Sequence, residues 1–345
     1  MAAVEIGPIE GIAILGGGTA FPSRELGNVE VLRSLPQPPP TEEQLQFLAA
    51  GAGQTLGLSR RAWAHAVGAP LDHAREETTL DLALRASQAA LRDAGLEAAD
   101  LSLILCATST PHRMTSTVAA PLGAALGAAA ACLDTRTGCS GGLFALSTAA
   151  LYLAAGTGPA LVVGAETFSK IIPPEHRGAQ LALGDGAAAL VLGRRAGAQL
   201  ISAALETDGA LGRLITTDGA LPPTGEEIAR GGYRLSGAPD ELAQVVPQKY
   251  AAAISAARRR AGGAEIDLFV PHQTSRALIA RVAAEAGIPL ERTFVNVERH
   301  ANIGAAGWMA ALVEARAEGR CPPGARLLLA AVGGGMSWAA AVLRC

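Results

Sequence analysis

Residues 134–142 read DTRTGCSGG, and this stretch decides the fold because it joins two elements of different type. The apolar run before it predicts a buried strand, and the alanine-rich pattern after it predicts a helix. Cys139 therefore stands at a strand-to-helix corner, where a helix N-terminus lowers the pKa of a thiol and makes a nucleophile. A small buried cysteine with a structural role fits the same pattern equally well, so these residues alone leave both interpretations open.

The same succession of strand, glycine-containing loop and helix occurs again later in the chain. The corresponding pairs are 102–108 with 266–274, 131–146 with 293–312, 160–166 with 327–333, and 187–193 with 338–344. Strands that alternate with helices predict parallel sheets covered by helices, hence an α/β fold. We therefore expect two similar halves, 1–194 and 195–345, with a functional site between them.

Three segments complete this organisation. Residues 75–101 show apolar residues at helical spacing, with Gly95 as a stop signal, and predict a helix. Residues 32–61 contain a proline run and are interpreted as an insertion or cover. Residues 217–237 are rich in glycine and proline, which indicates a loop of the kind that lines substrate entrances.

Composition favours a tightly layered α/β protein. Of 345 residues, 50% are hydrophobic but only 3% are aromatic, so the core must consist of small aliphatic side chains. The net charge of −3, without a concentrated basic face, argues against partners such as nucleic acid or an anionic membrane. The N-terminal residues do not resemble a secretory signal and no apolar stretch is suited to spanning a bilayer, so we expect a cytoplasmic location.

The cysteines do not form a recognisable ligand or disulfide pattern. Five cysteines, an odd number, are scattered without any CxxC pair. This argues against a disulfide framework and a zinc site. We therefore expect no metal and no cofactor.

Two further side chains could join Cys139 in chemistry. His272 comes directly after the predicted strand DLFV (267–270), where side chains tend to face a ligand crevice. Asn302 lies in the second-half counterpart of the Cys139 loop, and the glycines of 332–338 expose N–H groups of the kind that an oxyanion hole requires. Taken singly, the histidine could be satisfied by backbone hydrogen bonds and the asparagine could be a helix N-cap. A two-fold arrangement of the halves would bring these loops towards one centre.

At this point the chain resembles the β-ketoacyl-acyl-carrier-protein synthase III group of the thiolase fold. The matching segments are DTRTGCSGGLFAL (134–146), LGDGAAALVLG (183–193), VPHQ (270–273), NVERHANIGAAG (296–307) and GGGMSW (333–338). Their order and spacing cover nearly the whole chain. The resemblance implies two pseudo-repeated β/α halves in αβαβα layers, with the nucleophile in 1–194 and the histidine and asparagine in 195–345.

The resemblance also implies roles for individual residues. Cys139 would be the acyl-carrying nucleophile, with His272 and Asn302 beside it. The backbone N–H groups of Cys139 and Gly334 would form the oxyanion hole. Substrate-binding residues would be Met114, Gly335 and Ser337, with Met114 on a loop that caps the partner's acyl pocket across a homodimer. His300, two residues from Asn302, is interpreted as a loop histidine.

The implied reaction is acyl transfer from a thioester to Cys139, followed by decarboxylative condensation with a malonyl-type or β-ketoacyl carrier-protein thioester. Such a reaction would serve polyketide or other secondary metabolism, or fatty-acid initiation. Acyl-carrier protein and the acyl thioester are thus the expected partners. The alternative is an acyltransferase that passes the acyl group to an alcohol or amine. A non-catalytic partner subunit is disfavoured by the presence of Cys139.

Two departures from the family pattern concern the donor. Gly51 and Thr55 stand where the resemblance places the tryptophan and arginine that grip coenzyme A, and NIGAAG replaces the usual NTSAAS pattern around Asn302. We therefore expect a donor carried on acyl-carrier protein. The basic segment 257–263 could dock an acidic carrier protein, or could be a solvated helix end.

Overall fold

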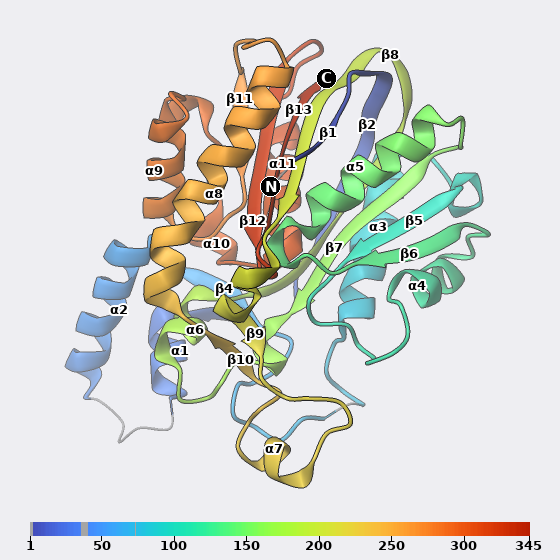
Figure 1. The fold of residues 1–345 in the computed structure, drawn as a ribbon. Coiled ribbons are helices and arrows are strands. Elements are labelled where there is room, and N and C mark those ends of the chain that lie inside the picture. The colour runs from blue at the N-terminus through green and yellow to red at the C-terminus, as the bar shows by residue number, and fades with distance from the viewer. Residues whose placement is uncertain (1–2, 36–40, 73) are drawn as a thin grey trace.

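The computed structural model describes residues 3–35, 41–72 and 74–345. At its centre is one long strand, β8 (Asp185–Thr207), within a nine-stranded system of paired strands (Figure 1). The first part of β8 pairs with β2 (Ile9–Ala20) and β7 (Ala160–Thr167). The later part pairs with β13 (Ser337–Arg344) and β1 (Val4–Ile6). β8 therefore belongs to two sheets.

These two sheets have the same strand order. In the first, β6 (Ala131–Thr135) lies beside β5 (Leu103–Ala107), followed by β7, β8 and β2. In the second, Thr293 bridges to β11 (Leu268–Pro271), which is followed by β12 (Arg326–Gly333), β13 and β8. The β5–β7 and β11–β12 pairs are parallel, and the next pair in each sheet is antiparallel. The predicted pseudo-repeat is confirmed.

The predicted boundary between residues 194 and 195 falls inside β8. Residues 194–197 are exposed, and Gly197 has a φ of +83° that favours glycine. Buried positions resume at Ala198, where the strand continues into the second sheet. Because β8 belongs to both halves, the division at this point stays a prediction.

Strand alternation builds a layered core. In β5, Leu103 and Leu105 face a central core, whereas Ile104 and Cys106 face an outer one. The central core contains α5 and α11 between the two sheets, α3 and α4 cover the outer face of the first sheet, and α8 and α9 cover the second. The bounds are α3 (Thr79–Ala94), α4 (Ala119–Leu126), α5 (Gly141–Ala154), α8 (Pro239–Arg260), α9 (Arg276–Glu285) and α11 (Gly307–Ala317). This is the expected αβαβα order.

The two central helices, α5 and α11, contact each other at Gly142. A Cβ on Gly142 would lie 2.9 Å from Trp308 Nε1 and 3.0 Å from the Ala305 carbonyl oxygen. A Cβ on Gly164 of β7 would lie 2.8 Å from Ala305. Glycine is therefore required for this contact between the halves, and the contact sets the separation of the loops that precede α5 and α11.

The helix predicted over 75–101 is α3. Thr78 caps its N-terminus by accepting from the Asp81 N–H, and Asp81 accepts from the Thr78 N–H in return. Gly95, with a φ of 64°, ends the helix as predicted. The predicted range was longer because the apolar spacing extends beyond both caps.

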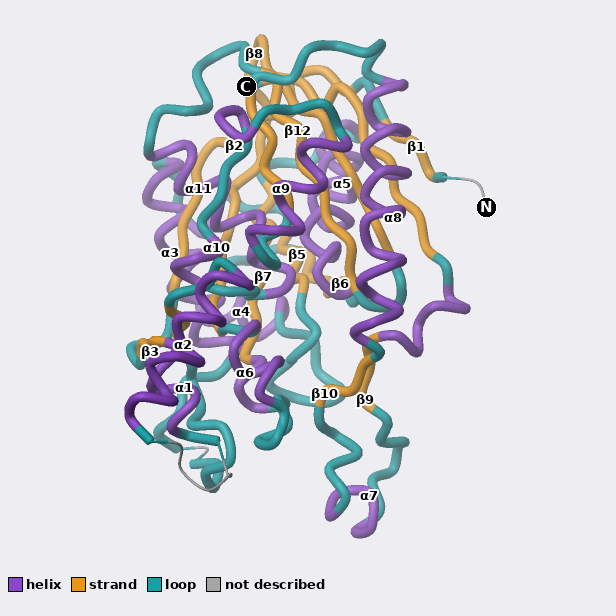
Figure 2. Tube along the Cα trace, turned by 90° about the vertical axis from the view of Figure 1, so that its left-hand side faces the viewer, coloured by secondary structure: helices purple, strands orange, loops and turns teal. Residues whose placement is uncertain are grey.

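The segments outside the repeat gather at the lower end of the molecule in Figures 1 and 2. Within 32–61, the described residues form the end of α1 and all of α2, while 36–40 lie outside the described residues. Residues 217–237 form a projecting excursion between two paired strands, with a short helix at its tip (Figure 2). The elements of this end are β3 (Glu25–Gly27), α1 (Asn28–Arg33), α2 (Glu42–Leu56), β4 (Arg60–Ala62), α6 (Arg177–Ala182), β9 (Ile215–Thr217), α7 (Gly225–Ala229) and β10 (Leu235–Gly237), whereas the short helix α10 (Val297–His300) belongs to the second half of the repeat.

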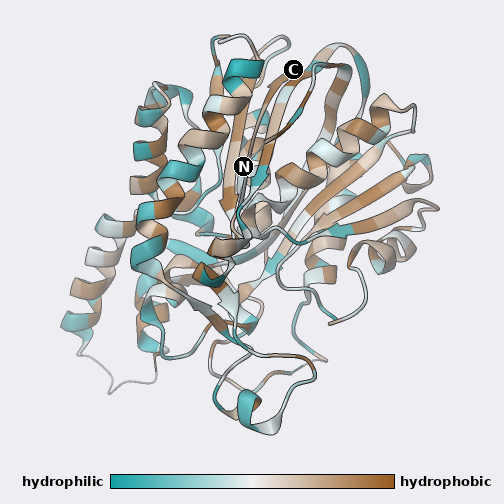
Figure 3. Cartoon of the chain, in the orientation of Figure 1, coloured by the Kyte–Doolittle hydropathy of each residue, from teal (hydrophilic) through white to brown (hydrophobic). Residues whose placement is uncertain are grey.

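Hydrophobic residues concentrate in the strands, whereas polar residues colour the outer faces of α2, α8 and α9 (Figure 3). Among the described residues, no helix combines the length and apolar character needed to cross a membrane.

Candidate active site

Cys139 lies in a short 3-10 turn, Gly138–Ser140, between β6 and α5. Gly138 has a φ of +56°, and a Cβ there would collide with the backbone N of Gly334. Conversely, a Cβ on Gly333 would lie 2.5 Å from the backbone N of Cys139. The turn that carries the cysteine and the glycine turn after β12 therefore approach each other across the two halves, as the pseudo-symmetry predicted.

Burial dominates the ionisation of Cys139. The residue keeps some exposed surface, but its thiol lies deep enough for burial to raise its pKa to about 12, and the Glu166 carboxyl adds to the rise. A backbone hydrogen bond acts in the opposite direction. The predicted lowering of this pKa is thus wrong, because loss of solvation outweighs the helix N-terminus.

His272 follows β11 and is 1% exposed. Its backbone N–H donates to the Ala330 carbonyl at 2.8 Å, which fixes the residue against β12. A Cβ on Gly307 would lie 2.8 Å from His272 Nδ1, so the start of α11 packs on the ring. Burial lowers the pKa of His272 to about 4, with the neighbouring Asn302 amide acting in the opposite direction. The imidazole is therefore neutral at pH 7.

Asn302 is held from both sides. Its backbone N–H donates to Ala182 and its carbonyl accepts from Gly184, both at 3.0 Å. Its side-chain Oδ1 accepts from the Gly304 N–H at 2.9 Å. With Oδ1 occupied, the amide NH2 group is left to donate. The N-cap alternative does not describe this geometry, since Ile303 is the N-cap of the turn that follows.

The backbone just before Asn302 is strained. Ala301 has φ 56° and ψ −161° and is fully buried. This region of backbone conformation is essentially reserved for glycine, and other residues occupy it at a cost. The strain lies immediately beside a candidate catalytic side chain.

Sequence reasoning missed Glu166, a buried carboxyl at the end of β7. It accepts from the Ser109 N–H at 3.0 Å and from Thr110 Oγ1 at 2.7 Å. A Cβ on Gly304 would lie 2.9 Å from Glu166 Oε1. The Glu166 carboxyl therefore packs against the backbone of the loop that carries Asn302. Burial raises the pKa of Glu166 to about 7, partly offset by these hydrogen bonds. An acidic residue ending an apolar strand was the available signal.

The remaining predicted substrate residues, Ser337, Gly335 and Met114, differ in their exposure to solvent. Ser337 is buried, with its hydroxyl bonded to Thr207 Oγ1 at 2.8 Å. Gly335 is exposed in the glycine turn, with a φ of 122°. Met114 is 60% exposed on the loop before α4. The structure therefore groups the loops of Cys139, His272, Asn302 and Gly334, and leaves Met114 at the surface.

His300 has structural partners. Its ring stacks on Phe21 with centroids 4.2 Å apart, and Nε2 bonds to Glu314 Oε1 at 2.7 Å. This arrangement agrees with the interpretation of His300 as a loop histidine. In the described part of the chain, no cluster of His, Cys, Asp or Glu has a geometry that could hold a metal ion.

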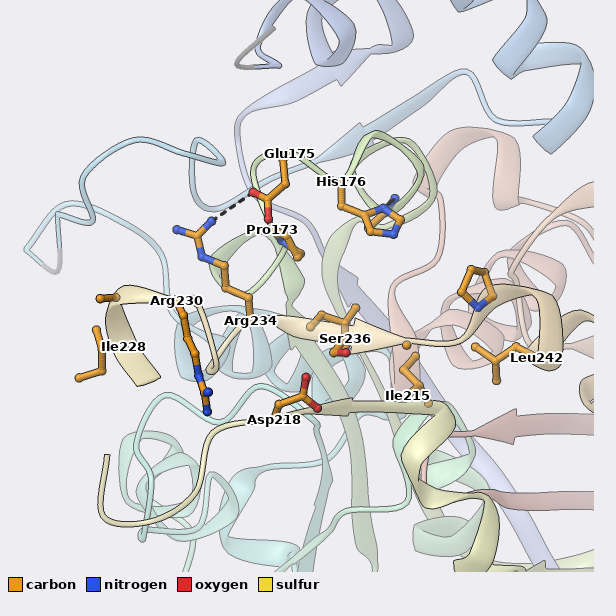
Figure 4. Close-up of a pocket in the computed structure, with 16 residues that line it drawn as sticks. Pro173, Glu175, His176, Ile215, Asp218, Ile228, Arg230, Arg234, Ser236 and Leu242 are labelled. Carbon is orange, nitrogen blue, oxygen red and sulfur yellow. Dashed lines mark hydrogen bonds and ion pairs between the residues drawn. The ribbon is translucent and has the colours of Figure 1, made fainter. Parts of the chain in front are cut away.

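A cavity of about 610 Å³ lies beside the glycine turn (Figure 4). Ile215 lies between the cavity and the glycine turn. It lines the cavity, and its Cγ2 would lie 2.9 Å from a Cβ on Gly334. Arg230 and Arg234 line the far part, with Arg234 3.8 Å from Glu175. The predicted entrance loop 217–237 supplies much of this wall.

Comparison with known proteins identifies the family. The C-terminal family model "3-Oxoacyl-[acyl-carrier-protein (ACP)] synthase III C terminal" matches residues 257–345, and the model "3-Oxoacyl-[acyl-carrier-protein (ACP)] synthase III" matches 133–209. A relative from Rhodobacter capsulatus, "Beta-ketoacyl-[acyl-carrier-protein] synthase III", is 34% identical over 341 residues, covering 96% of this chain and 98% of the relative. This chain belongs to the β-ketoacyl-[acyl-carrier-protein] synthase III family.

Solved structures agree with this assignment. The synthase III of Aquifex aeolicus VF5 matches with a TM-score of 0.84 and 28% identity, covering 97% of this chain and all (100%) of that one. The priming β-ketosynthase of the R1128 polyketide pathway matches with a TM-score of 0.81 and 25% identity, covering 98% and 97%. As a member of this family, the chain is a condensing acyltransferase of the thiolase fold.

Proposed function

We propose that this synthase III transfers an acyl group from a thioester to Cys139 and then condenses it with a malonyl-type or β-ketoacyl carrier-protein thioester. The observation that carries the proposal is the meeting of the Cys139 and Gly333–Gly334 turns beside a buried, neutral His272 and an oriented Asn302 amide. The pathway would be polyketide or other secondary metabolism, or fatty-acid initiation.

In the first half-reaction, the Cys139 sulfur attacks the donor thioester and loses its proton, and the donor thiol leaves protonated. The backbone N–H groups of Cys139 and Gly334 stabilise the developing oxyanion. Preorganised N–H donors cost no reorganisation, and the glycines at 138 and 333 allow the two turns to approach.

In the second half-reaction with a malonyl-type extender, the β-carboxylate leaves as CO2 and its bonding electrons form the enolate of the extender thioester. His272 and the Asn302 amide donate hydrogen bonds to its thioester oxygen. The enolate carbon attacks the acyl-cysteine, and the Cys139 thiolate leaves and is reprotonated. A pKa near 4 makes His272 a poor base but keeps it neutral and able to donate, which favours this role.

We propose a donor held on acyl-carrier protein. Its pantetheine arm would approach through the 610 Å³ cavity, where Ile215 adjoins Gly334 and Arg230 and Arg234 offer positive charge. Gly51 and Thr55 lie exposed on α2, with open space around a Cβ at Gly51, so neither offers a nucleotide grip. The basic segment 257–263 is a weaker candidate for docking, since Arg258 and Arg260 already donate to backbone carbonyls of Ala286 and Gly7.

We further propose a homodimer formed through β6 and α5. β6 ends the strand order of its sheet, and Leu151 and Tyr152 of α5 are 47% and 44% exposed. An unpaired edge beside exposed apolar side chains favours association with a second copy. Met114, on its exposed loop, would then reach the partner's acyl pocket. Light scattering on Tyr152→Arg should show a shift towards monomer, and an unchanged mass would contradict this interface.

One experiment separates the main alternatives. Intact-protein mass spectrometry follows acylation of Cys139 by acyl-coenzyme A and by acyl-carrier protein, and malonyl-carrier protein is then added with CO2 measured. We expect faster acylation from the carrier protein, followed by CO2 release, and Cys139→Ala should abolish the adduct. Rapid acylation by coenzyme A alone would overturn the donor assignment. Acylation without CO2 release would favour transfer to an alcohol or amine.

A further inference from the structure

A second cavity, of about 780 Å³, lies at the end of β13 remote from the Cys139 site. β13 starts at Ser337 beside the glycine turn and ends at Arg344, and eight residues of strand span about 25 Å. Two cysteines, Cys321 and Cys345, both line this cavity, and both are partly exposed. Neither belongs to the machinery proposed for condensation.

Backbone hydrogen bonds hold the two cysteine segments together. The Gly324 N–H donates to the Cys345 carbonyl at 2.8 Å, and the Cys345 N–H donates to the Ala325 carbonyl at 3.0 Å. Both cysteines also pack against the same central core. The turn after α11 and the end of β13 are therefore fixed side by side, and both cysteines face the same cavity.

The surroundings make the two thiols unequal. The proximity of Cys345, together with burial, raises the pKa of Cys321, although Arg316 and Arg320 oppose this rise, whereas the pKa of Cys345 is lowered chiefly by the proximity of Cys321. Arg316 and Arg195 lower the pKa of Cys345 further, while burial and Asp267 oppose the change. Arg316 is held in place by donating to the Ile14 carbonyl at 2.8 Å. Cationic neighbours and partial exposure are the setting in which cysteines react with oxidants.

We propose that Cys321 and Cys345 form a reversible dithiol–disulfide pair that is oxidised by hydrogen peroxide. The Cys345 thiolate attacks peroxide and becomes a sulfenic acid, and the released hydroxide takes up a proton to give water. The Cys321 sulfur then attacks the Cys345 sulfur, forming the S–S bond as a second water leaves. Two thiols are oxidised and one peroxide is reduced. The proposal is independent of the condensation chemistry.

The sequence allows a direct test. Glu318 is the last acidic residue before Cys345, so cleavage after glutamate places both cysteines on the single peptide 319–345, apart from Cys106, Cys132 and Cys139. After peroxide and alkylation of free thiols, we expect this peptide to lose two hydrogens and escape alkylation, and dithiothreitol should restore both thiols. Overoxidised but unbridged cysteines, or a bridge only between separate chains, would overturn the proposal.

Single variants separate the roles of the two thiols. In Cys321→Ser, the sulfenic acid should persist at Cys345 and be trapped by dimedone. In Cys345→Ser, oxidation of Cys321 should be slower by about tenfold or more, because an ordinary thiol replaces the activated one. Equal oxidation rates of the two single variants would contradict the assignment of Cys345 as the attacking residue.

Cys132→Ser is the matched control. Cys132 is also partly exposed, but its Sγ donates to the Ala130 carbonyl and burial raises its pKa. The bridge on peptide 319–345 should form in this variant at the wild-type rate. Loss of the bridge in Cys132→Ser would show that the reaction runs through another thiol.

Discussion

At the residue scale, His272 couples the proposed chemistry to stability. Burial lowers its pKa from 6.5 to about 4, so between these values the unfolded chain binds a proton that the native protein does not. The contribution of His272 to the free energy of unfolding is thus fully present above pH 6.5. It is lost as pH falls towards 4, by about 3 kcal/mol in total. Urea unfolding of wild type and His272→Gln at several pH values should show a steeper acid loss for wild type.

Wild type and His272→Gln must be compared because other buried groups change the free energy of unfolding with pH in the opposite direction. Burial raises the pKa of Glu166 to about 7 and that of Asp185 to about 6, so their contributions weaken as pH rises. These terms cancel in the difference between wild type and variant. Parallel pH curves for wild type and His272→Gln would refute the assignment.

Ala301 offers a second prediction at this scale. Its φ of 56° and ψ of −161° suit glycine, so Ala301→Gly should stabilise the fold by about 1 kcal/mol, measured from the urea midpoint. Ala310→Gly, a buried substitution within regular α11, should instead destabilise by about 1 kcal/mol or more. If both variants were destabilised relative to wild type, the strain at Ala301 would be negligible.

At the element scale, the contact between α5 and α11 sets the spacing of the Cys139 and Asn302 loops. Gly142→Ala would place a Cβ 2.9 Å from Trp308 Nε1 and 3.0 Å from the Ala305 carbonyl, so we expect a loss of about 1–3 kcal/mol. Acylation of Cys139 should slow as well, because the turn before α5 must shift. Stability and acylation rate are both measured on the purified variant.

Gly51→Ala is the control for this substitution. Gly51 lies within exposed α2, and a Cβ there would meet no described atom within 4 Å. Alanine should therefore stabilise by up to about 1 kcal/mol through helix propensity and leave acylation unchanged. A neutral Gly142→Ala would mean that the two central helices can separate without cost.

Sequence pattern predicted these elements well where local signals decide them. Gly95 and the strand ends before Cys139 and His272 were readable because glycine, apolar runs and periodicity act locally. The raised pKa of Cys139 and the position of Glu166 under Gly304 were not, because both depend on segments remote in sequence. The position of His272 after a predicted strand and the place of Asn302 in the repeat made them candidates, but their chemical roles were inferred from the family resemblance.

At the scale of the whole molecule, the repeat predicted two similar halves, and residues 194–197 do carry a boundary signal in their exposure and in Gly197. The structure nevertheless carries β8 through this point, so that one strand pairs with β7 before it and with β13 after it. The central core draws side chains from both sheets, as well as from α5 and α11. Pattern within each half could not reveal this shared strand and core.

A shared strand and a shared core should make the halves unfold together. Separating them would expose the central core of both, so a state with one half folded gains little stability. We expect urea unfolding followed by far-ultraviolet circular dichroism and by tryptophan fluorescence to give coincident single transitions. Fluorescence reports on Trp63 in a separate buried cluster, Trp308 in the central layer and Trp338 in the second sheet, whereas circular dichroism averages over both halves. Transitions that separate, or a plateau between them, would show that β8 can be disrupted near residue 194 without unfolding both sheets.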